Sequence, residues 1–487
     1  MEFFNPEKIS KGASKLVYSW LFFAVSTLIF AGIFAFLLAM SRTPFIQDLM
    51  PAKNYLYTAL VIHVILSVVI WFLAFEGVLW IVSIAVFPSL NPPIEPFEGR
   101  HAGKGLKGEL FSIPLGWLGF MLSASGTILL IIAGLKAWGE PLLANYIPVL
   151  THPVFYTGLI LFASGIFLTI LNTLLSIIKN AGRSGIQYFL TPVPFILTLA
   201  GLTVLIAISC FVLAYNFLPS TLNINMYFER LFWGGGHILQ FSNTFGMICA
   251  WILLTQITLH KSPMPDRPAM LFALISFAFT LPAPFFYFLF DILSVDLREW
   301  FTLLMQFGLG PLAVAFAISI ILATNIFKDD ESTVAILKRL PWGDPGFSSL
   351  ILSIIVFSTG GILSLAIKGI DVKIPSHYHG VIGGVTLSFM GLSYHILPLL
   401  NRKIPDSMMA KIQPYLYGIG QMLFILGMFW AGTHGVPRKT YGEAQNLDDF
   451  VKMAGMAIMG FGGLIAISGG ATYVLNILIP LLKRTKT

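Results

Sequence analysis

The sequence predicts an all-α, polytopic membrane protein, and three observations support this fold class. Of the 487 residues, 56% are hydrophobic and only 10% are charged, and the mean hydropathy is +0.84. Soluble globular proteins carry about 25% charged residues, so this composition excludes a soluble enzyme, a disordered chain and a nucleic-acid-binding protein. The two cysteines, Cys210 and Cys249, lie in apolar runs and provide neither a disulfide framework nor a zinc site.

Twelve apolar runs are long enough to be transmembrane helices, because about 20 apolar residues cross the roughly 30 Å hydrocarbon core. The runs cover residues 17–40, 57–86, 113–136, 153–178, 192–216, 231–258, 269–290, 299–325, 346–367, 376–400, 412–433 and 453–480. The connections between them are short and leave no room for a soluble domain. We therefore expect residues 1–487 to form a single twelve-helix transmembrane domain.

The distribution of positive charge indicates the orientation of the chain. When the N-terminus is placed inside, most of the 29 Lys and Arg residues fall in the inner loops and termini. This bias predicts that both termini are cytoplasmic and supports an even number of spans. We expect a multi-pass protein of the prokaryotic inner (cytoplasmic) membrane, and the net charge of +7 is mainly a topology signal.

Four of the nine histidines lie near the outer ends of apolar runs: His63, His237, His377 and His379. At about 1.5 Å per residue, all four fall within roughly the outer third of the membrane. A lone intramembrane histidine is usually satisfied by a backbone carbonyl. Four imidazoles at one depth on three helices instead favour ligands for something held between those helices.

The His377-Tyr378-His379 segment is the most informative of these features. Residues i and i+2 on a helix point about 200° apart, so one helix could ligate two cofactors, one on each flank. Neutral imidazole is a normal axial ligand for haem iron. If His63 faces one flank, it completes a bis-histidine site, and the other flank keeps a single protein ligand and an open position.

These motifs resemble the catalytic subunit of the haem-copper oxidases, subunit I. The similar features are the twelve spans, the histidine of the second span, WGGGHILQF in the sixth and SHYHGVIGGVTLSFMGLSYHILPLL in the tenth. The resemblance implies that His63 and His379 hold a low-spin haem and that His377 holds a high-spin haem. The loop GVPRKTYGE resembles the family's Gly-x-Pro-Arg-Arg loop, which implies that Arg438 and Lys439 pair with haem propionates. An ordinary pair of loop charges is the alternative interpretation of these two cations.

This sequence departs from the family's pattern at the second-metal site. Three histidines hold the metal in the family, and His237 corresponds to one of them. The other two form a His-His pair in the seventh span, and the register set by SVDLREWFT puts Phe286 and Tyr287 at those positions. Phe241 stands where one oxidase subgroup has a tyrosine and nitric oxide reductases have a glutamate. One imidazole with a tyrosine is a poor copper site, so we expect copper to be absent and His237 to be a vestigial ligand.

Ionisable groups are scarce inside the spans. The eighth span lacks the lysine that many relatives use for proton uptake, and Glu76 is the one carboxylate well inside a span. An intramembrane carboxylate usually has a function, which favours a proton or quinone role for Glu76. The alternative interpretation is that the Glu76 side chain snorkels to the inner interface. This scarcity argues against a proton-consuming oxidase.

These observations favour a dihaem membrane cytochrome that transfers electrons within a respiratory complex. Its electron donor would be a cytochrome c, a quinol or a partner subunit. One alternative is an active terminal oxidase or nitric oxide reductase whose unusual second-metal site uses His237 and Tyr287. Another is a structural or assembly subunit that keeps only the fold. Whether the chain is itself an oxidoreductase stays open at this point.

Overall fold

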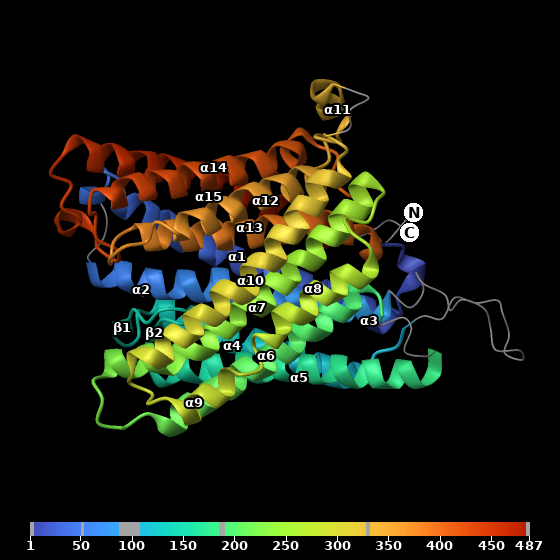
Figure 1. The fold of residues 1–487 in the computed structure, drawn as a ribbon, viewed down its shortest axis with the longest axis horizontal. Helices are drawn as coiled ribbons and strands as arrows, with labels where there is room; N and C mark the ends of the chain where they lie inside the picture. Colours follow the sequence, from blue (N-terminus) through green and yellow to red (C-terminus); the bar gives the residue numbers. More distant parts are fainter. Residues whose placement is uncertain (1–3, 50–52, 87–107, 185–189, 328–331, 484–487) are drawn as a thin grey trace, which may run out of the picture.

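The computed structural model describes residues 4–49, 53–86, 108–184, 190–327 and 332–483, and these residues are almost entirely helical (Figure 1). Among them, twelve helices are long and apolar enough to span a membrane, as the sequence predicts. They are α1 (Lys11–Arg42), α2 to α3 (Lys53–Val64 and Trp71–Ala85), α4 (Ile113–Leu135), α5 (Pro153–Ser184), α6 (Pro192–Phe217), α7 (Ile224–Leu259), α8 to α9 (Asp266–Ala278 and Phe286–Leu289), α10 (Val295–Ala323), α12 (Pro345–Ser364), α13 (Lys373–Ile396), α14 (Met408–Thr433) and α15 (Phe450–Leu482).

Two spans are interrupted where the sequence predicts continuous helices. In the second span, a π-helical segment, η3 (Ile65–Ile70), joins α2 to α3 directly after His63. Such segments are rare and are often found at functional sites. In the seventh span, α8 ends before Pro282 and Pro284, which have no N–H to donate to a helical ladder. The chain then passes through the 3-10 turn η6 (Ala283–Phe285) into the short helix α9.

The two ends of the bundle differ in what they carry. A hairpin of β1 (Pro141–Leu142) and β2 (Val149–Leu150) lies at the same end as the loop between α14 and α15 (Figure 1). At the other end, α1 begins beside the end of α15, and the Tyr18 hydroxyl donates to the carbonyl oxygen of Leu481 at 3.3 Å. The short helix α11 (Thr333–Arg339) also lies at that end.

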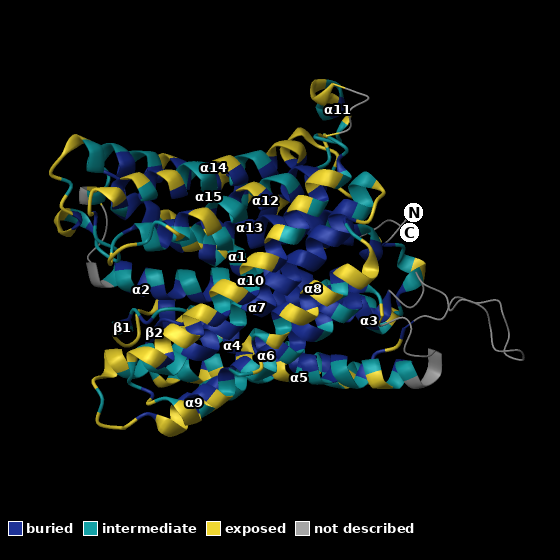
Figure 2. Ribbon diagram, in the orientation of Figure 1, coloured by how far each residue is buried: buried dark blue, intermediate teal, exposed yellow. Residues whose placement is uncertain are grey.

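Helices α3, α7 and α13 are the most completely buried of the bundle (Figure 2). All fifteen residues of α3 are buried, and α7 is buried along most of its length. The outer helices instead alternate buried and exposed residues, as expected for helices that face lipid. The three central helices carry Glu76, His237, His377 and His379. Glu76 and His237 are buried, and His377 and His379 are partly buried.

Candidate functional site

The two histidines of α13 contact different helices. The Nδ1 atom of His377 lies 2.8 Å from the carbonyl oxygen of Gly360 on α12. The His379 ring packs edge-on against Phe424 of α14, with 4.9 Å between the ring centroids. A carbonyl oxygen only accepts, so Nδ1 of His377 carries the proton and Nε2 has the free lone pair that binds metals. The predicted separation of the two rings onto opposite flanks agrees with these contacts.

The close approach of α12 to α13 depends on glycine. A Cβ atom on Gly360 would lie 2.6 Å from the backbone nitrogen of Val381, and one on Gly380 would lie 2.5 Å from the Cα atom of Gly360. Both distances are far shorter than van der Waals contact. The glycine pair therefore lets the two backbones meet, which brings the Gly360 carbonyl to His377.

His63 is anchored in the same way as His377. It lies near the end of α2, and its Nδ1 atom is 3.0 Å from the carbonyl oxygen of Ala31 on α1. The Ser67 hydroxyl in η3 donates to the His63 carbonyl oxygen at 2.6 Å. His379 lies within electrostatic range of His63. The fold thus brings together the two residues that the resemblance pairs as ligands of one haem.

Arg42 is a residue of this region that sequence reasoning missed. It ends α1, lies within electrostatic range of His379, and stacks over the Tyr441 ring with 5.9 Å from Cζ to the centroid. Its Nη2 atom donates to the carbonyl oxygen of Pro437 at 3.4 Å, whereas its Nε atom is buried without a hydrogen-bond partner among the described residues. A buried guanidinium with an unused donor suits an anionic or carbonyl group beside His379. In the sequence, Arg42 resembles an ordinary interfacial cation.

His237 differs from these histidines because both of its ring nitrogens are engaged. Nδ1 lies 2.8 Å from the carbonyl oxygen of Trp233, one turn earlier on α7. Nε2 lies 2.9 Å from the Tyr146 hydroxyl and 3.5 Å from the Thr302 hydroxyl. Burial, with the Glu229 carboxylate nearby, raises the pKa of Tyr146 above its ordinary value. The phenol therefore stays protonated and donates to Nε2, which occupies the lone pair that a metal would need.

Tyr146 was also missed by sequence reasoning. It belongs to the loop of the β1–β2 hairpin, 91 residues before His237, and has a positive φ of 66°. A side chain rarely adopts that backbone conformation, so the loop is held by its contacts. The Tyr146 ring packs on the His237 ring with 4.6 Å between the centroids. Nothing in the sequence marks a loop tyrosine as the partner of a helix histidine.

The two positions that correspond to the His-His pair are filled by aromatic packing. Phe286 and Tyr287 are buried on α9 and both contact the Phe301 ring, at 5.6 Å between centroids in each case. The Tyr287 hydroxyl has no hydrogen-bond partner among the described residues and lies beside Gly234. Within the same described part of the chain, no three His, Cys, Asp or Glu side chains gather closely enough to hold a metal ion.

Arg438 and Lys439 lie in the loop between α14 and α15, and they bind the β1–β2 hairpin. Both donate to the Asn145 side-chain oxygen, and Lys439 Nζ also donates to the Leu143 carbonyl oxygen. The backbone and side-chain N–H groups of Asn145 donate to the Glu229 carboxylate at 2.8 and 2.6 Å. Asn145 therefore links the two cations to α7 and holds the loop that carries Tyr146.

The charge of Lys439 depends on these surroundings. Burial, together with the neighbouring Arg438, lowers the pKa of Lys439 to about 8, and the Glu229 carboxylate partly opposes this shift. An additional anion at this position would favour the charged form. Arg438 and Lys439 therefore form a cationic site that can bind a further anionic group.

Glu76 is fully buried on α3 and does not reach the inner interface. Its Oε2 atom accepts a 2.5 Å hydrogen bond from the Ser242 hydroxyl on α7. Its Oε1 atom is buried and has no partner among the described residues. The alternative of a snorkelling carboxylate is therefore wrong, since the side chain is enclosed between α3, α7 and α13.

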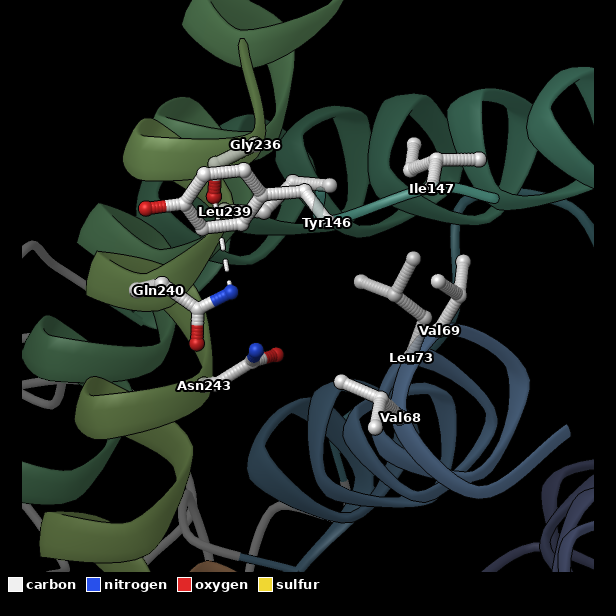
Figure 3. Close-up of a pocket in the computed structure, with 9 residues that line it drawn as sticks. All are labelled: Val68, Val69, Leu73, Tyr146, Ile147, Gly236, Leu239, Gln240 and Asn243. Carbon is white, nitrogen blue, oxygen red and sulfur yellow. Dashed lines mark hydrogen bonds between the residues drawn. The ribbon is translucent and has the colours of Figure 1, made fainter. Parts of the chain in front are cut away.

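A small cavity of about 20 Å³ lies between the second span and α7, beside the hairpin loop (Figure 3). The polar residues that line it are Tyr146, Gln240 and Asn243. The remaining lining residues are Val68, Val69, Leu73, Ile147, Gly236 and Leu239.

The structure is therefore that of a twelve-span membrane protein whose helices bring imidazoles together near one end of the bundle. The family model described as Cytochrome C and Quinol oxidase polypeptide I matches residues 104–465. The chain belongs to this family, which confirms the resemblance seen in the motifs.

The relatives range from full-length to partial matches. An uncharacterised protein of Rickettsia prowazekii is 28% identical over 95% of both chains, and another of Aquifex aeolicus is 27% identical over 78% of this chain and 84% of its own. Cytochrome c oxidase subunit 1 of Thermus thermophilus is 30% identical, but only over 22% of this chain and 21% of its own. The structure of a haem-copper terminal oxidase dimer matches with a TM-score of 0.74 at 17% identity, covering 98% of this chain and 86% of that one.

Proposed function

We propose that this protein is a dihaem membrane cytochrome that transfers electrons within a respiratory complex and lacks the second metal of the oxidases. One observation carries the proposal. His63 and His377 donate from Nδ1 to backbone carbonyls of other helices, which leaves Nε2 available, whereas Nε2 of His237 accepts from Tyr146.

The donor set around α13 fits haem. His63 and His379 would hold the low-spin haem and His377 the high-spin haem. Bound haem supplies reversible one-electron transfer, and the chain's own residues orient and tune it. Carbonyl acceptors at Nδ1 fix the tautomer and the orientation of the imidazoles. The unused Nε donor of Arg42 also fits a polar group of a ligand beside His379.

Arg438 and Lys439 would pair with haem propionates in the outer loop. Their present partner, the Asn145 side-chain oxygen, is a neutral acceptor shared by both cations. A carboxylate is a stronger partner for either one, because hydrogen bonds between charged groups are roughly twice as strong as neutral ones.

The donor set around His237 does not fit copper or non-haem iron. The His-His positions carry Phe286 and Tyr287, and the remaining imidazole is capped on both sides. No step of the proposed function therefore uses a second metal. The high-spin haem would relay electrons or bind a small gaseous ligand on its open side.

The partners would be other membrane or periplasmic subunits, with a cytochrome c or a quinol as the electron donor. Members of this family work in multi-subunit respiratory complexes, and the twelve spans fit the inner (cytoplasmic) membrane with both termini inside. The even number of spans supports placing the two termini on one side.

Cofactor analysis of the purified full-length chain tests this proposal. A pyridine haemochrome assay should give two haems per chain, and metal analysis should give iron without copper or a third iron. The reduced spectrum should contain one low-spin component and one component that responds to carbon monoxide. Less than one haem per chain would favour the structural or assembly role instead.

The similarity in fold to a terminal oxidase favours one other candidate, an active oxidase or nitric oxide reductase. In that case His237 and Tyr287 would contribute to an unusual second-metal site. Consumption of oxygen or nitric oxide with stoichiometric copper or non-haem iron would establish this candidate and exclude ours.

A further inference from the structure

We propose that an open pocket between α1, α4 and the 3-10 turn η7 (Leu397–Leu400) binds the headgroup of an anionic phospholipid. The pocket lies at the end of the bundle where α1 begins, beside both chain termini (Figure 1). None of its lining residues belongs to the proposed haem sites, so this inference goes beyond the proposed function and does not require a particular haem content.

The pocket is formed mainly by the first turns of α1. Its volume is about 260 Å³, against about 20 Å³ for the cavity of Figure 3. Positions three and four apart are neighbours on a helix surface, so the lining residues of α1 form one face. Small-ligand pockets begin at roughly 300 Å³, which makes this space suitable for a headgroup. The lining residues are Ser14, Lys15, Tyr18 and Ser19 of α1, Trp117 of α4 and Leu400 of η7.

The polar groups of the pocket are mainly unused hydrogen-bond donors. Within the described part of the chain, the Lys15 ammonium and the Trp117 indole N–H have no hydrogen-bond partner. The same is true of the Ser14 and Ser19 hydroxyls. No acidic side chain is among the lining residues of this described pocket. A phosphodiester carries one negative charge and several acceptor oxygens, so it matches this set of donors.

Cations from three separate segments surround the pocket. Lys11 lies one helical turn before Lys15 on α1. Arg402 and Lys403 follow η7, and Lys483 follows the last residue of α15. These charges attract an anion to the same place from which the unused donors can bind it.

Two hydrogen bonds bring the three segments together. The Tyr18 hydroxyl on α1 donates to the carbonyl oxygen of Leu481 at 3.3 Å, and the Arg402 guanidinium donates to the carbonyl oxygen of Lys483. The Nε atom of Arg402 is buried and has no partner among the described residues. The end of α15 is therefore held beside α1 and η7, and the positive charge of Arg402 is not neutralised there.

The acidic side chains closest in sequence to these segments leave this positive charge in place. Asp406 follows η7, but its carboxylate pairs with the Lys411 ammonium at 2.8 Å. Glu7, which precedes α1, is exposed to solvent. The surroundings of the pocket therefore favour an anionic ligand.

The position of the pocket favours a lipid over a soluble anion. Tyr18 and Trp117 are of the two residue types that gather at membrane interfaces. The Tyr18 ring stacks on Phe22, with 6.1 Å between the centroids. Ile29 and Ile33 follow Tyr18 and Phe22 by about three helical turns, and they are 42% and 55% exposed. This apolar face of α1 offers a surface for acyl chains below the headgroup.

The charge of the membrane surface favours an anionic lipid. The distribution of Lys and Arg predicts that this end of the bundle is cytoplasmic. The cytoplasmic leaflet has a negative surface potential because it contains anionic lipids, which attract Lys and Arg residues close to the membrane. The occupant is therefore an anionic phospholipid of that leaflet.

Native mass spectrometry of the full-length chain in detergent tests this site. Phosphatidylglycerol should bind more tightly than phosphatidylcholine, which has the same phosphodiester but no net charge. Lys15→Gln should lower the affinity for phosphatidylglycerol by about fivefold, the effect of one cation near an anionic lipid surface, and should reduce the preference. Lys338→Gln is the matched control, because Lys338 is an exposed cation of α11 at the same end and does not line the pocket.

A second variant tests the hydroxyl donors separately from the charge. Combining Ser14→Ala with Ser19→Ala removes two donors of the pocket without changing its charge. Binding of phosphatidylglycerol and of phosphatidylcholine should weaken by a similar factor, because the two lipids share the phosphodiester. An unchanged affinity for both lipids would contradict binding of the headgroup at these hydroxyls.

Three further results would overturn the proposal. The first is equal affinity for phosphatidylglycerol in Lys15→Gln and the parent chain, and the second is an equal loss in Lys338→Gln. The third is binding of inorganic phosphate as tight as that of the lipid, which would indicate a site for a soluble anion. Haem content is measured on the same samples, and a low value contradicts the proposed function without affecting the result on lipid binding.

Discussion

Two regions near the same end of the bundle use the same side chain in opposite ways. Around α13, the His63 and His377 rings are anchored through Nδ1 by carbonyl groups of neighbouring helices. On α7, the His237 ring is anchored by its own helix and its Nε2 atom is closed by the Tyr146 hydroxyl. An imidazole at a suitable depth can therefore act as a ligand only where the surrounding residues leave its Nε2 atom free.

The largest effect is expected from removing a ligand of the low-spin haem. Replacing His63 or His379 by Ala should remove one haem per chain and the low-spin signal, because a six-coordinate site loses an axial ligand. Haem quantification and electron paramagnetic resonance measure this. His434→Ala, at an exposed histidine just after α14, is the control and should keep both haems. Retention of the low-spin signal in both variants would refute the ligand assignment.

His377→Ala should remove the other haem. The carbon monoxide response of the reduced spectrum should disappear, while the low-spin signal remains, because the two rings contact different helices. If this variant instead removed the low-spin signal, the assignment of His377 and His379 to separate haems would be wrong.

Substitution in the second region should have a smaller effect on cofactors. His237→Ala should change the haem content little, since its Nε2 atom already has a protein partner. Abolished haem binding or activity in this variant would break the comparison. Tyr146→Phe should lower the free energy of unfolding by about 0.5–1.5 kcal/mol, because the buried Nε2 atom loses its shorter hydrogen bond and keeps only the 3.5 Å contact to Thr302. Thermal unfolding in detergent measures this loss.

The region around His237 lacks metal ligands, and adding them should create a metal-binding site. The combined variant Tyr146→Phe, Phe286→His and Tyr287→His should bind one Zn²⁺ or Cu²⁺ per chain, because it frees Nε2 of His237 and supplies two more imidazoles. The variant that keeps Tyr146 should bind the metal more weakly. Equal affinity in the two variants would show that Tyr146 does not close the site.

The smallest expected effect concerns Lys439. In the haem-free chain its pKa is lowered to about 8 by burial, so the charged form is lost as the pH rises through that value. If a propionate binds the charged form, haem affinity should fall above pH 8, by at most about tenfold per pH unit for one linked proton. Haem transfer to an apoglobin measures this, and Lys439→Met should remove the slope. An equal slope in the variant would exclude Lys439 as a propionate partner.

Much of the architecture could be predicted because it depends on local sequence. Hydropathy located all twelve spans, and their order placed the histidines of the second, sixth and tenth spans near one end of the bundle. The break in the seventh span was missed, although Pro282 and Pro284 indicate it, because hydropathy does not register the loss of backbone donors. The burial of Glu76 was left open, since a window average does not show which side of a helix faces protein.

The fold class and the number of spans could be predicted from the sequence alone, because length and hydropathy are properties of short segments. The contacts of each imidazole, in contrast, depend on how distant segments pack together. Tyr146 and His237 are 91 residues apart, Arg438 reaches Asn145 across 293, and Glu76 meets Ser242 across 166. Such hydrogen bonds depend on how a loop or a helix docks on another, and no local pattern encodes that docking.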